Sequence, residues 1–110
     1  LYQKVGYTAE TIAVYKRVLE FREDRYRVAF NLGVLLERLG SPEKAIEAYR
    51  KAARSEDERG AFALFQVGSL SKKAGKATEA RQALEEFLAR WKGDPKMEIR
   101  AQRMLEDMAP

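Results

Sequence analysis

The chain has 110 residues, of which 45% are hydrophobic, so it can bury one modest core and is too short for two ordinary domains. It contains no cysteine and no histidine, which excludes disulfide frameworks, thiolate metal sites and the usual general base near neutral pH. Its formal net charge of +4 is a mild excess of cations, without the clustered basic stripe of a dedicated nucleic-acid binder. We therefore expect one unit with no enzymatic activity, no cofactor and no metal.

Helical signals follow one another along the whole chain. Alanine, leucine and charged residues dominate, and the aliphatic residues do not alternate with polar ones as they would in a strand. The expected fold class is therefore all-α. We expect residues 1–5 to be the last turn of a helix whose beginning is missing, and we expect further helices at about 8–22, 26–39, 42–55, 61–74, 77–91 and 95–108.

The first turn is predicted around Gly6, with Thr8 as the N-cap of the helix at 8–22. That helix has an apolar side whose partner helix would lie ahead of Leu1. We expect this side to be exposed, and an exposed apolar patch of this kind either pairs in a dimer or marks a truncated end. Its residues are Ile12, Tyr15, Val18 and Leu19.

The following turns carry stronger signals. Gly40 comes just after a helix end, Ser41 is at the next N-cap, and Pro42 is at the first helical position, which is the favoured order of residue types. The segment around Gly75 is expected to form the same turn.

Two glycines are predicted inside helices, at Gly33 and Gly68. Glycine costs about 1 kcal/mol relative to alanine in a helix interior, so its repetition suggests that a neighbouring helix approaches closely. The small side chains of Ala45 and Ala80 are the expected opposing surfaces.

Carboxylates offer no convincing catalytic pair. Glu56, Asp57 and Glu58 form a charge run between two predicted helices, which is usually a solvated loop. Glu85 and Glu86 are adjacent in a predicted helix, so their side chains point in different directions.

The last segment, from Asp94 and Pro95 onward, is predicted to be a helix that seals the open end of a stack, because one side is apolar and the other is charged. Its methionines lie on the apolar side, which favours core packing over a soft metal site. Trp91 is expected to fill the space before this helix. The apolar side comprises Met97, Ala101, Met104, Leu105 and Met108.

The sequence also repeats itself. The segment that opens at Asn31 returns in altered form at Gln66, a shift of 35 residues, and a shift of 34 places Tyr15 on Tyr49. A repeat of this length indicates a stack of helical hairpins. The second copy carries the pattern Ala29, Leu32, Gly33, Leu36, Gly40, Ala45, Tyr49 and Ala52.

This pattern resembles the tetratricopeptide repeat. The third copy keeps Leu64, Val67, Gly68, Gly75, Ala80 and Leu84, but has Ser71 in place of a large residue and Phe87 in place of alanine. The first copy retains Tyr2, Gly6, Tyr15 and Val18. The resemblance covers one domain over residues 1–110, divided into a partial first repeat at 1–25, repeats at 26–60 and 61–93, and a capping helix at 94–110.

The resemblance implies a right-handed α-solenoid of antiparallel helix hairpins. The first helix of each hairpin lines a concave groove that receives a peptide or a partner helix, and no reaction is implied. The groove residues that follow from the repeat register are Arg27, Phe30, Asn31, Val34, Arg38, Phe62, Phe65, Gln66, Ser69 and Lys73.

Two features of this expected groove have two interpretations each. Phe30 and Phe65 share a register and are expected to lie side by side, either as the apolar floor of the groove or as packing between helices. Lys4, Arg38 and Lys73 also share a register. These three cations either form a basic rim of the groove or complement the dipoles of their helices near the helix C-termini.

We therefore predict a protein-interaction scaffold, excerpted from a larger protein, that binds a protein or peptide partner carrying some acidic residues. The alternatives are a self-associating structural module, with a homodimer through the N-terminal face, and a helical-repeat RNA binder of the pentatricopeptide type. The apolar groove disfavours nucleic acid. We expect no small-molecule substrate and no membrane association. We also predict no carboxylate clamp for the acidic tails of chaperones, because the groove positions lack the residue types that such a clamp needs.

Overall fold

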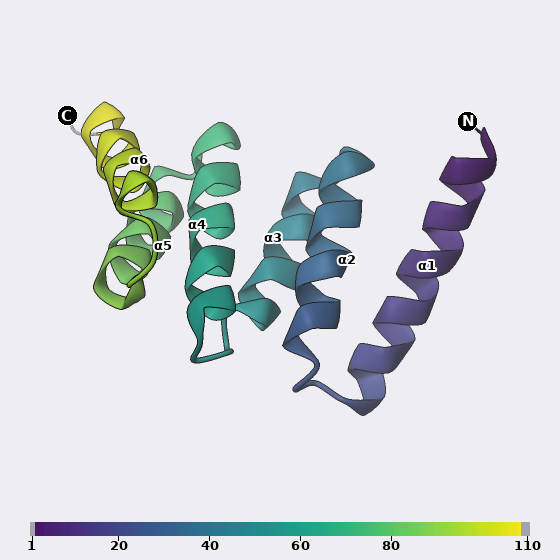
Figure 1. Ribbon diagram of the computed structural model, residues 1–110. Coiled ribbons are helices and arrows are strands. Elements are labelled where there is room, and N and C mark those ends of the chain that lie inside the picture. The colour runs from purple at the N-terminus through teal and green to yellow at the C-terminus, as the bar shows by residue number, and fades with distance from the viewer. Residues whose placement is uncertain (1, 109–110) are drawn as a thin grey trace.

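The computed structural model describes residues 2–108, with side chains from Thr8 onward. Within these residues the chain is all-α and contains no strand. Figure 1 shows the helices arranged in a row from α1 to α5 and α6, with the two chain ends at opposite ends of the row. The helices are α1 (Tyr2–Phe21), α2 (Tyr26–Arg38), α3 (Pro42–Ala52), α4 (Glu58–Lys73), α5 (Ala77–Arg90) and α6 (Pro95–Asp107).

The turns within the two hairpins α2–α3 and α4–α5 are built in the same way, as their sequences predict. Gly40 and Gly75 have φ values of 76° and 77°, which only glycine adopts at little cost. The amide N–H of Ser41 donates to the carbonyl oxygen of Leu36 at 2.9 Å, and the corresponding bond of the next hairpin joins Lys76 to Ser71 at 2.9 Å. These bonds satisfy the last carbonyls of α2 and α4. Each hairpin therefore reverses direction within three residues.

The core consists of two clusters. The first lies among α1, α2 and α3, with part of α4 and Ala83 of α5, and the second joins α4, α5 and α6. Gly33 and Gly68 make the predicted close approaches, because a β-carbon on either would lie within 3.0 Å of a side chain on the facing helix. The nearest side chains are those of Tyr49 and Leu84, and the expected Ala80 also faces Gly68, through its carbonyl oxygen at 3.5 Å from such a β-carbon.

The predicted turn at Gly6 is wrong. Helix α1 runs without a break from Tyr2 to Phe21, so Thr8 lies inside the helix and is not its N-cap. Continuing the helix satisfies the backbone N–H and C=O groups of this segment at the cost of one interior glycine.

The expected orientation of α1 is also wrong. Ile12 and Leu19 are buried in the first cluster, where α1 packs against α2, whereas we expected them to be exposed. Tyr15 and Val18 are half-buried. The exposed apolar side chains of this helix are instead Val14 and Phe21, with exposed fractions of 58% and 76%. The apolar stripe of α1 thus already has a partner, and a different part of its surface is unpartnered.

The acidic run between α3 and α4 has a structural role. Asp57 is the N-cap of α4 and accepts hydrogen bonds from the backbone N–H groups of Arg59 at 3.0 Å and Gly60 at 3.3 Å. The hydroxyl of Ser55 also donates to Asp57 at 2.6 Å, and this bond lowers the pKa of the Asp57 carboxyl. Helix α4 consequently begins at Glu58, three residues before the predicted start at 61.

Helix α6 covers the last hairpin, as its apolar side predicts. Ala101 is fully buried, and the apolar residues Met97, Met104, Leu105 and Met108 pack against the second cluster. Polar contacts hold the helix in place. Lys72 of α4 forms an ion pair with Asp107 at 3.2 Å, and the Arg100 guanidinium lies 5.1 Å from the ring centroid of Phe65.

Candidate functional site

A pocket of about 420 Å³ opens between the N-terminal ends of α2 and α4. Its size falls within the range of pockets that hold small ligands or single side chains of a partner. Seven residues from three elements line it: Arg27, Phe30 and Asn31 of α2, Glu58, Arg59 and Phe62 of α4, and Trp91, which directly follows α5. We refer to these seven residues as the aromatic pocket.

Three half-buried aromatic rings give the aromatic pocket its apolar character. Phe30 and Phe62 stack with ring centroids 5.7 Å apart and an interplanar angle of 29°. Trp91 stacks on Phe87 of the core at 5.2 Å, and its indole N–H donates to the carbonyl oxygen of Asp94 at 2.9 Å. The indole N–H is therefore already satisfied, so Trp91 offers a ligand its ring and no hydrogen-bond donor.

Polar side chains surround these rings. Arg27 and Arg59 contribute two positive charges and Glu58 contributes one negative charge, so the net charge of the lining is 2 − 1 = +1. All three side chains are exposed. Within residues 8–108 neither guanidinium group has an ion-pair partner. Both arginines are thus available to carboxylates of a ligand.

Next to the aromatic pocket, Tyr49 connects α3 with α2. Its ring is fully buried and meets Phe30 edge-on, with ring centroids 5.2 Å apart. Its hydroxyl donates to Oε1 of Glu37 at 2.9 Å. Burial, together with this hydrogen bond to a carboxylate, raises the pKa of the Tyr49 hydroxyl to about 12. Tyr49 therefore fixes the position from which Phe30 extends into the aromatic pocket.

The comparisons with known proteins agree with the repeated hairpins. A family model of the tetratricopeptide repeat matches residues 2–61, and a second model of the same repeat matches residues 62–93. The chain belongs to the tetratricopeptide repeat family. A comparison with individual curated proteins found no match. Tetratricopeptide repeats generally mediate protein–protein interaction, and the family is typically a non-enzymatic interaction module.

The aromatic pocket brings together four of the ten groove residues that the repeat register predicts: Arg27, Phe30, Asn31 and Phe62. Phe65 is only 2% exposed, because it lies in the second cluster beneath Arg100 of α6. It is therefore a core residue of the tetratricopeptide repeats and does not line a groove. Phe30 and Phe65 are not direct neighbours, since the ring of Phe62 lies between them.

The remaining predicted groove residues lie outside the aromatic pocket. Val34, Gln66 and Ser69 are half-buried, farther along α2 and α4. Arg38 and Lys73 are exposed in the last turns of these helices. The third member of the predicted cation series, Lys4, lies outside the residues whose side chains are described. The basic rim of the tetratricopeptide groove thus stays a prediction.

Three residues of the aromatic pocket were not predicted as site residues. Glu58 and Arg59 were assigned to a loop, and Trp91 was interpreted as a plug before the last helix. Asp57 is the sequence feature that could have predicted the positions of Glu58 and Arg59. Aspartate is a favoured N-cap, and an N-cap places the two residues after it in the first turn of a helix. Trp91 does pack beside α6, but it also contributes to the aromatic pocket.

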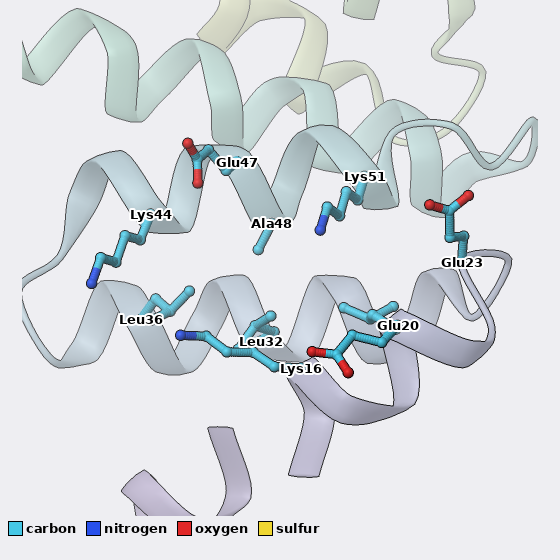
Figure 2. Close-up of a pocket in the computed structure, with 10 residues that line it drawn as sticks. Lys16, Glu20, Glu23, Leu32, Leu36, Lys44, Glu47, Ala48 and Lys51 are labelled. Atoms are coloured by element: carbon cyan, nitrogen blue, oxygen red, sulfur yellow. The ribbon is translucent and has the colours of Figure 1, made fainter. Parts of the chain in front are cut away.

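A second cleft, of about 460 Å³, lies between α1 and α3 above α2. Figure 2 shows charged side chains of α1 and α3 along its two edges, with Leu32, Leu36 and Ala48 between them. These three apolar residues are only 3–6% exposed, so a ligand would gain little by covering them. The charged residues are Lys16 and Glu20 on α1, Glu23 in the loop after α1, and Lys44, Glu47 and Lys51 on α3.

A search of the described side chains finds no cluster of three or more acidic residues with metal-binding geometry. Among the helices in residues 2–108, none combines the length and apolar character that crossing a bilayer requires. The aromatic pocket, with its half-buried rings and exposed arginines, is the candidate site.

Proposed function

We propose that this tetratricopeptide repeat chain is a non-enzymatic scaffold that binds a peptide or a partner helix of another protein in the concave groove lined by α2 and α4. The aromatic pocket is the anchor site of this groove. It receives one apolar or aromatic side chain of the partner, and acidic residues beside that side chain interact with Arg27 and Arg59.

The observation that carries this proposal is the combination of half-buried rings with two unpaired guanidinium groups. Phe30, Phe62 and Trp91 offer apolar surface that no other part of the described chain covers. Aromatic side chains and arginine are enriched among the residues that contribute most to binding at protein interfaces. Because the guanidinium groups have no partner in residues 8–108, an acidic ligand displaces no existing ion pair.

A peptide array tests this proposal. Each peptide carries one central anchor, which is tryptophan, leucine or alanine, between flanks that are acidic, neutral or basic. We expect the peptides with a large anchor and acidic flanks to bind best, and we expect this preference to weaken as salt concentration rises. Equal binding of alanine-anchored peptides, or a preference for basic flanks, would contradict the proposal.

Matched variants locate the binding site. Arg27→Glu combined with Arg59→Glu reverses the charge beside the aromatic pocket and should weaken acidic peptides by at least about tenfold. Arg50→Glu combined with Arg54→Glu makes the same change in net charge at exposed positions outside the pocket, and should leave the affinity nearly unchanged. If both pairs reduce binding equally, long-range charge and not the aromatic pocket explains the affinity.

A further inference from the structure

The indole ring of Trp91 is held on three sides by α5 and by the turn that follows it. The ring stacks on Phe87, and its N–H donates to the carbonyl oxygen of Asp94. The ring also lies against Gly93, since a β-carbon on Gly93 would overlap Cζ2 of the indole and would lie 2.8 Å from Cε2. Trp91 thus contributes to the aromatic pocket from a position that the turn between α5 and α6 fixes.

The indole, and not the backbone conformation, requires the glycine at position 93. Gly40 and Gly75 have positive φ values, whereas Gly93 does not, so alanine can adopt its backbone conformation. The three atoms nearest to a β-carbon at this position all belong to the Trp91 side chain. A methyl group added at position 93 therefore acts first on the indole.

Asp94 connects the indole with the N-terminus of α6. Its carbonyl oxygen accepts two hydrogen bonds, from the Trp91 indole N–H at 2.9 Å and from the amide N–H of Met97 at 3.0 Å. Its side chain is the N-cap of α6 and accepts from the amide N–H of Lys96 at 2.9 Å. One residue therefore holds both a ring of the aromatic pocket and the first turn of the helix that covers the last hairpin.

We propose that Gly93 and Asp94 are the positioning residues of the aromatic pocket, which hold the Trp91 indole in place and couple occupation of the pocket to the first turn of α6. Neither residue is among the seven that line the pocket, so both act through Trp91. The effect on affinity rests on the proposed groove function, whereas the position of the indole can be measured without a ligand. Because coupling between two sites is reciprocal, a ligand that immobilises Trp91 also stabilises the N-terminus of α6.

Hydrogen exchange of the ligand-free protein, followed by nuclear magnetic resonance, tests the position of the indole. We expect the Trp91 indole N–H to exchange at least about tenfold faster in Gly93→Ala than in the parent chain, because the displaced ring loses its hydrogen bond to Asp94. Amides inside α2 should exchange at the same rate in both proteins, which shows that the variant is folded. Equal exchange of the indole N–H would overturn the proposal, whether or not any peptide binds.

A double-mutant cycle tests whether Gly93 acts through Trp91. The ligand is a peptide with a central phenylalanine and two aspartates on either side, and calorimetry measures its affinity. Gly93→Ala should weaken this peptide by about three- to tenfold in the parent chain, which is the range for one aromatic pair. In a chain that carries Trp91→Leu, the same substitution should weaken the peptide by less than about twofold.

The cycle separates this proposal from the proposed groove function. Equal losses of affinity in the two chains would mean that Gly93 acts on the fold in general, and would overturn its positioning role. If the peptide does not bind the parent chain, the groove function is refuted, and exchange of the indole N–H still decides whether Gly93 positions Trp91.

Matched substitutions of Asp94 test the coupling to α6. Asp94→Ala removes the N-cap, whereas Asp94→Asn removes the same negative charge and keeps a favoured N-cap residue. The peptide should therefore bind at least about twofold more weakly to Asp94→Ala than to Asp94→Asn. In the parent chain, saturating peptide should slow exchange of the Lys96 and Met97 amides and leave the Met108 amide, at the other end of α6, unchanged. Equal affinities of the two variants, or unchanged exchange at Lys96 and Met97, would overturn the coupling.

Discussion

The aromatic ring of Tyr49 lies directly against the backbone of Gly33. A β-carbon on Gly33 would lie 2.7 Å from Cε1 and 2.8 Å from Cδ1 of the ring, which is closer than such atoms approach one another in proteins. The same ring contacts Phe30 and is held by the hydrogen bond from its hydroxyl to Glu37. The glycine therefore allows α2 and α3 to meet with a large, immobile side chain between them.

Gly33→Ala should destabilise the protein by up to about 2 kcal/mol, because overpacking costs about 1–3 kcal/mol while alanine improves helix propensity by about 1 kcal/mol. Gly68→Ala is the informative comparison. Its β-carbon would lie 2.6 Å from Cγ and Cδ2 of Leu84, which is also fully buried but lacks the hydrogen bond and the ring contact that hold Tyr49. Chemical denaturation should show a larger loss in the free energy of unfolding for Gly33→Ala than for Gly68→Ala. Equal losses would mean that the Tyr49 ring also moves to make room.

Gly60→Ala should destabilise the protein more than Gly33→Ala or Gly68→Ala does. A β-carbon at this position would overlap the carbonyl oxygen of Ser55 and would lie 2.8 Å from Nη2 of Arg90. Arg90 donates from Nη1 to the carbonyl oxygen of Ala53 at 3.1 Å, so the substitution disturbs the junction that joins α3, α4 and α5. We expect a loss of about 3 kcal/mol or more in the free energy of unfolding. A loss below that of Gly33→Ala in the same denaturation experiment would contradict this ranking.

Tyr49 should make stability depend on pH in the alkaline range. Its pKa is about 12 in the folded protein and about 10 in the unfolded chain, so below pH 10 both states hold the proton and the stabilisation is complete. Between pH 10 and 12 the unfolded state loses the proton first, and the free energy of unfolding falls by roughly 2–3 kcal/mol.

Urea denaturation at about pH 9 and about pH 11 measures roughly half of this loss, about 1.4 kcal/mol, because the folded protein still holds the proton at pH 11. Tyr49→Phe is the control, because it keeps the ring and removes the titrating hydroxyl, while the other tyrosines and the lysines titrate in both proteins. The variant should be less stable at the lower pH and should lose less on going to the higher pH. Parallel losses in the two proteins would show that Tyr49 does not carry the effect.

Ser71→Ala should stabilise the protein. The Ser71 side chain is fully buried, and its hydroxyl has no hydrogen-bond partner among the described residues. A buried unsatisfied hydroxyl costs about 1–3 kcal/mol, and alanine also favours the helix. Ser69→Ala on the same helix separates these effects, because Ser69 is half-buried and gains only propensity. The thermal midpoint should rise more for Ser71→Ala, and an equal rise would indicate that the Ser71 hydroxyl is satisfied in solution.

Local signals explain which parts of the fold could be predicted from the sequence. Gly40 with Pro42 marks a turn through backbone conformations that few other residues adopt, and the apolar side of α6 follows helical spacing within one segment. Gly6 resembles Gly40 only in residue type. It is followed by Tyr7 and Thr8, without the N-cap serine and the proline that follow Gly40, and it lies inside a continuous helix.

Errors in the candidate site have a different origin. The repeat register placed Phe65 beside Phe30, but α6 covers Phe65 in the folded protein, and register alone does not show which element packs over a residue. Arg59 and Trp91 lie outside the parts of the repeat that the register compares. Their positions follow from the N-cap at Asp57 and from the chain path between α5 and α6, which are particular to this sequence.

Trp91 is the only tryptophan of the chain, and it contributes to the lining of the aromatic pocket while its ring stacks on Phe87 of the core. Its indole fluorescence therefore comes from one known position. A ligand that excludes water from the pocket should shift this emission to shorter wavelength, whereas loosening of α6 should shift it to longer wavelength. The protein thus carries an intrinsic optical probe that distinguishes occupation of the groove from loss of the cap without any added label.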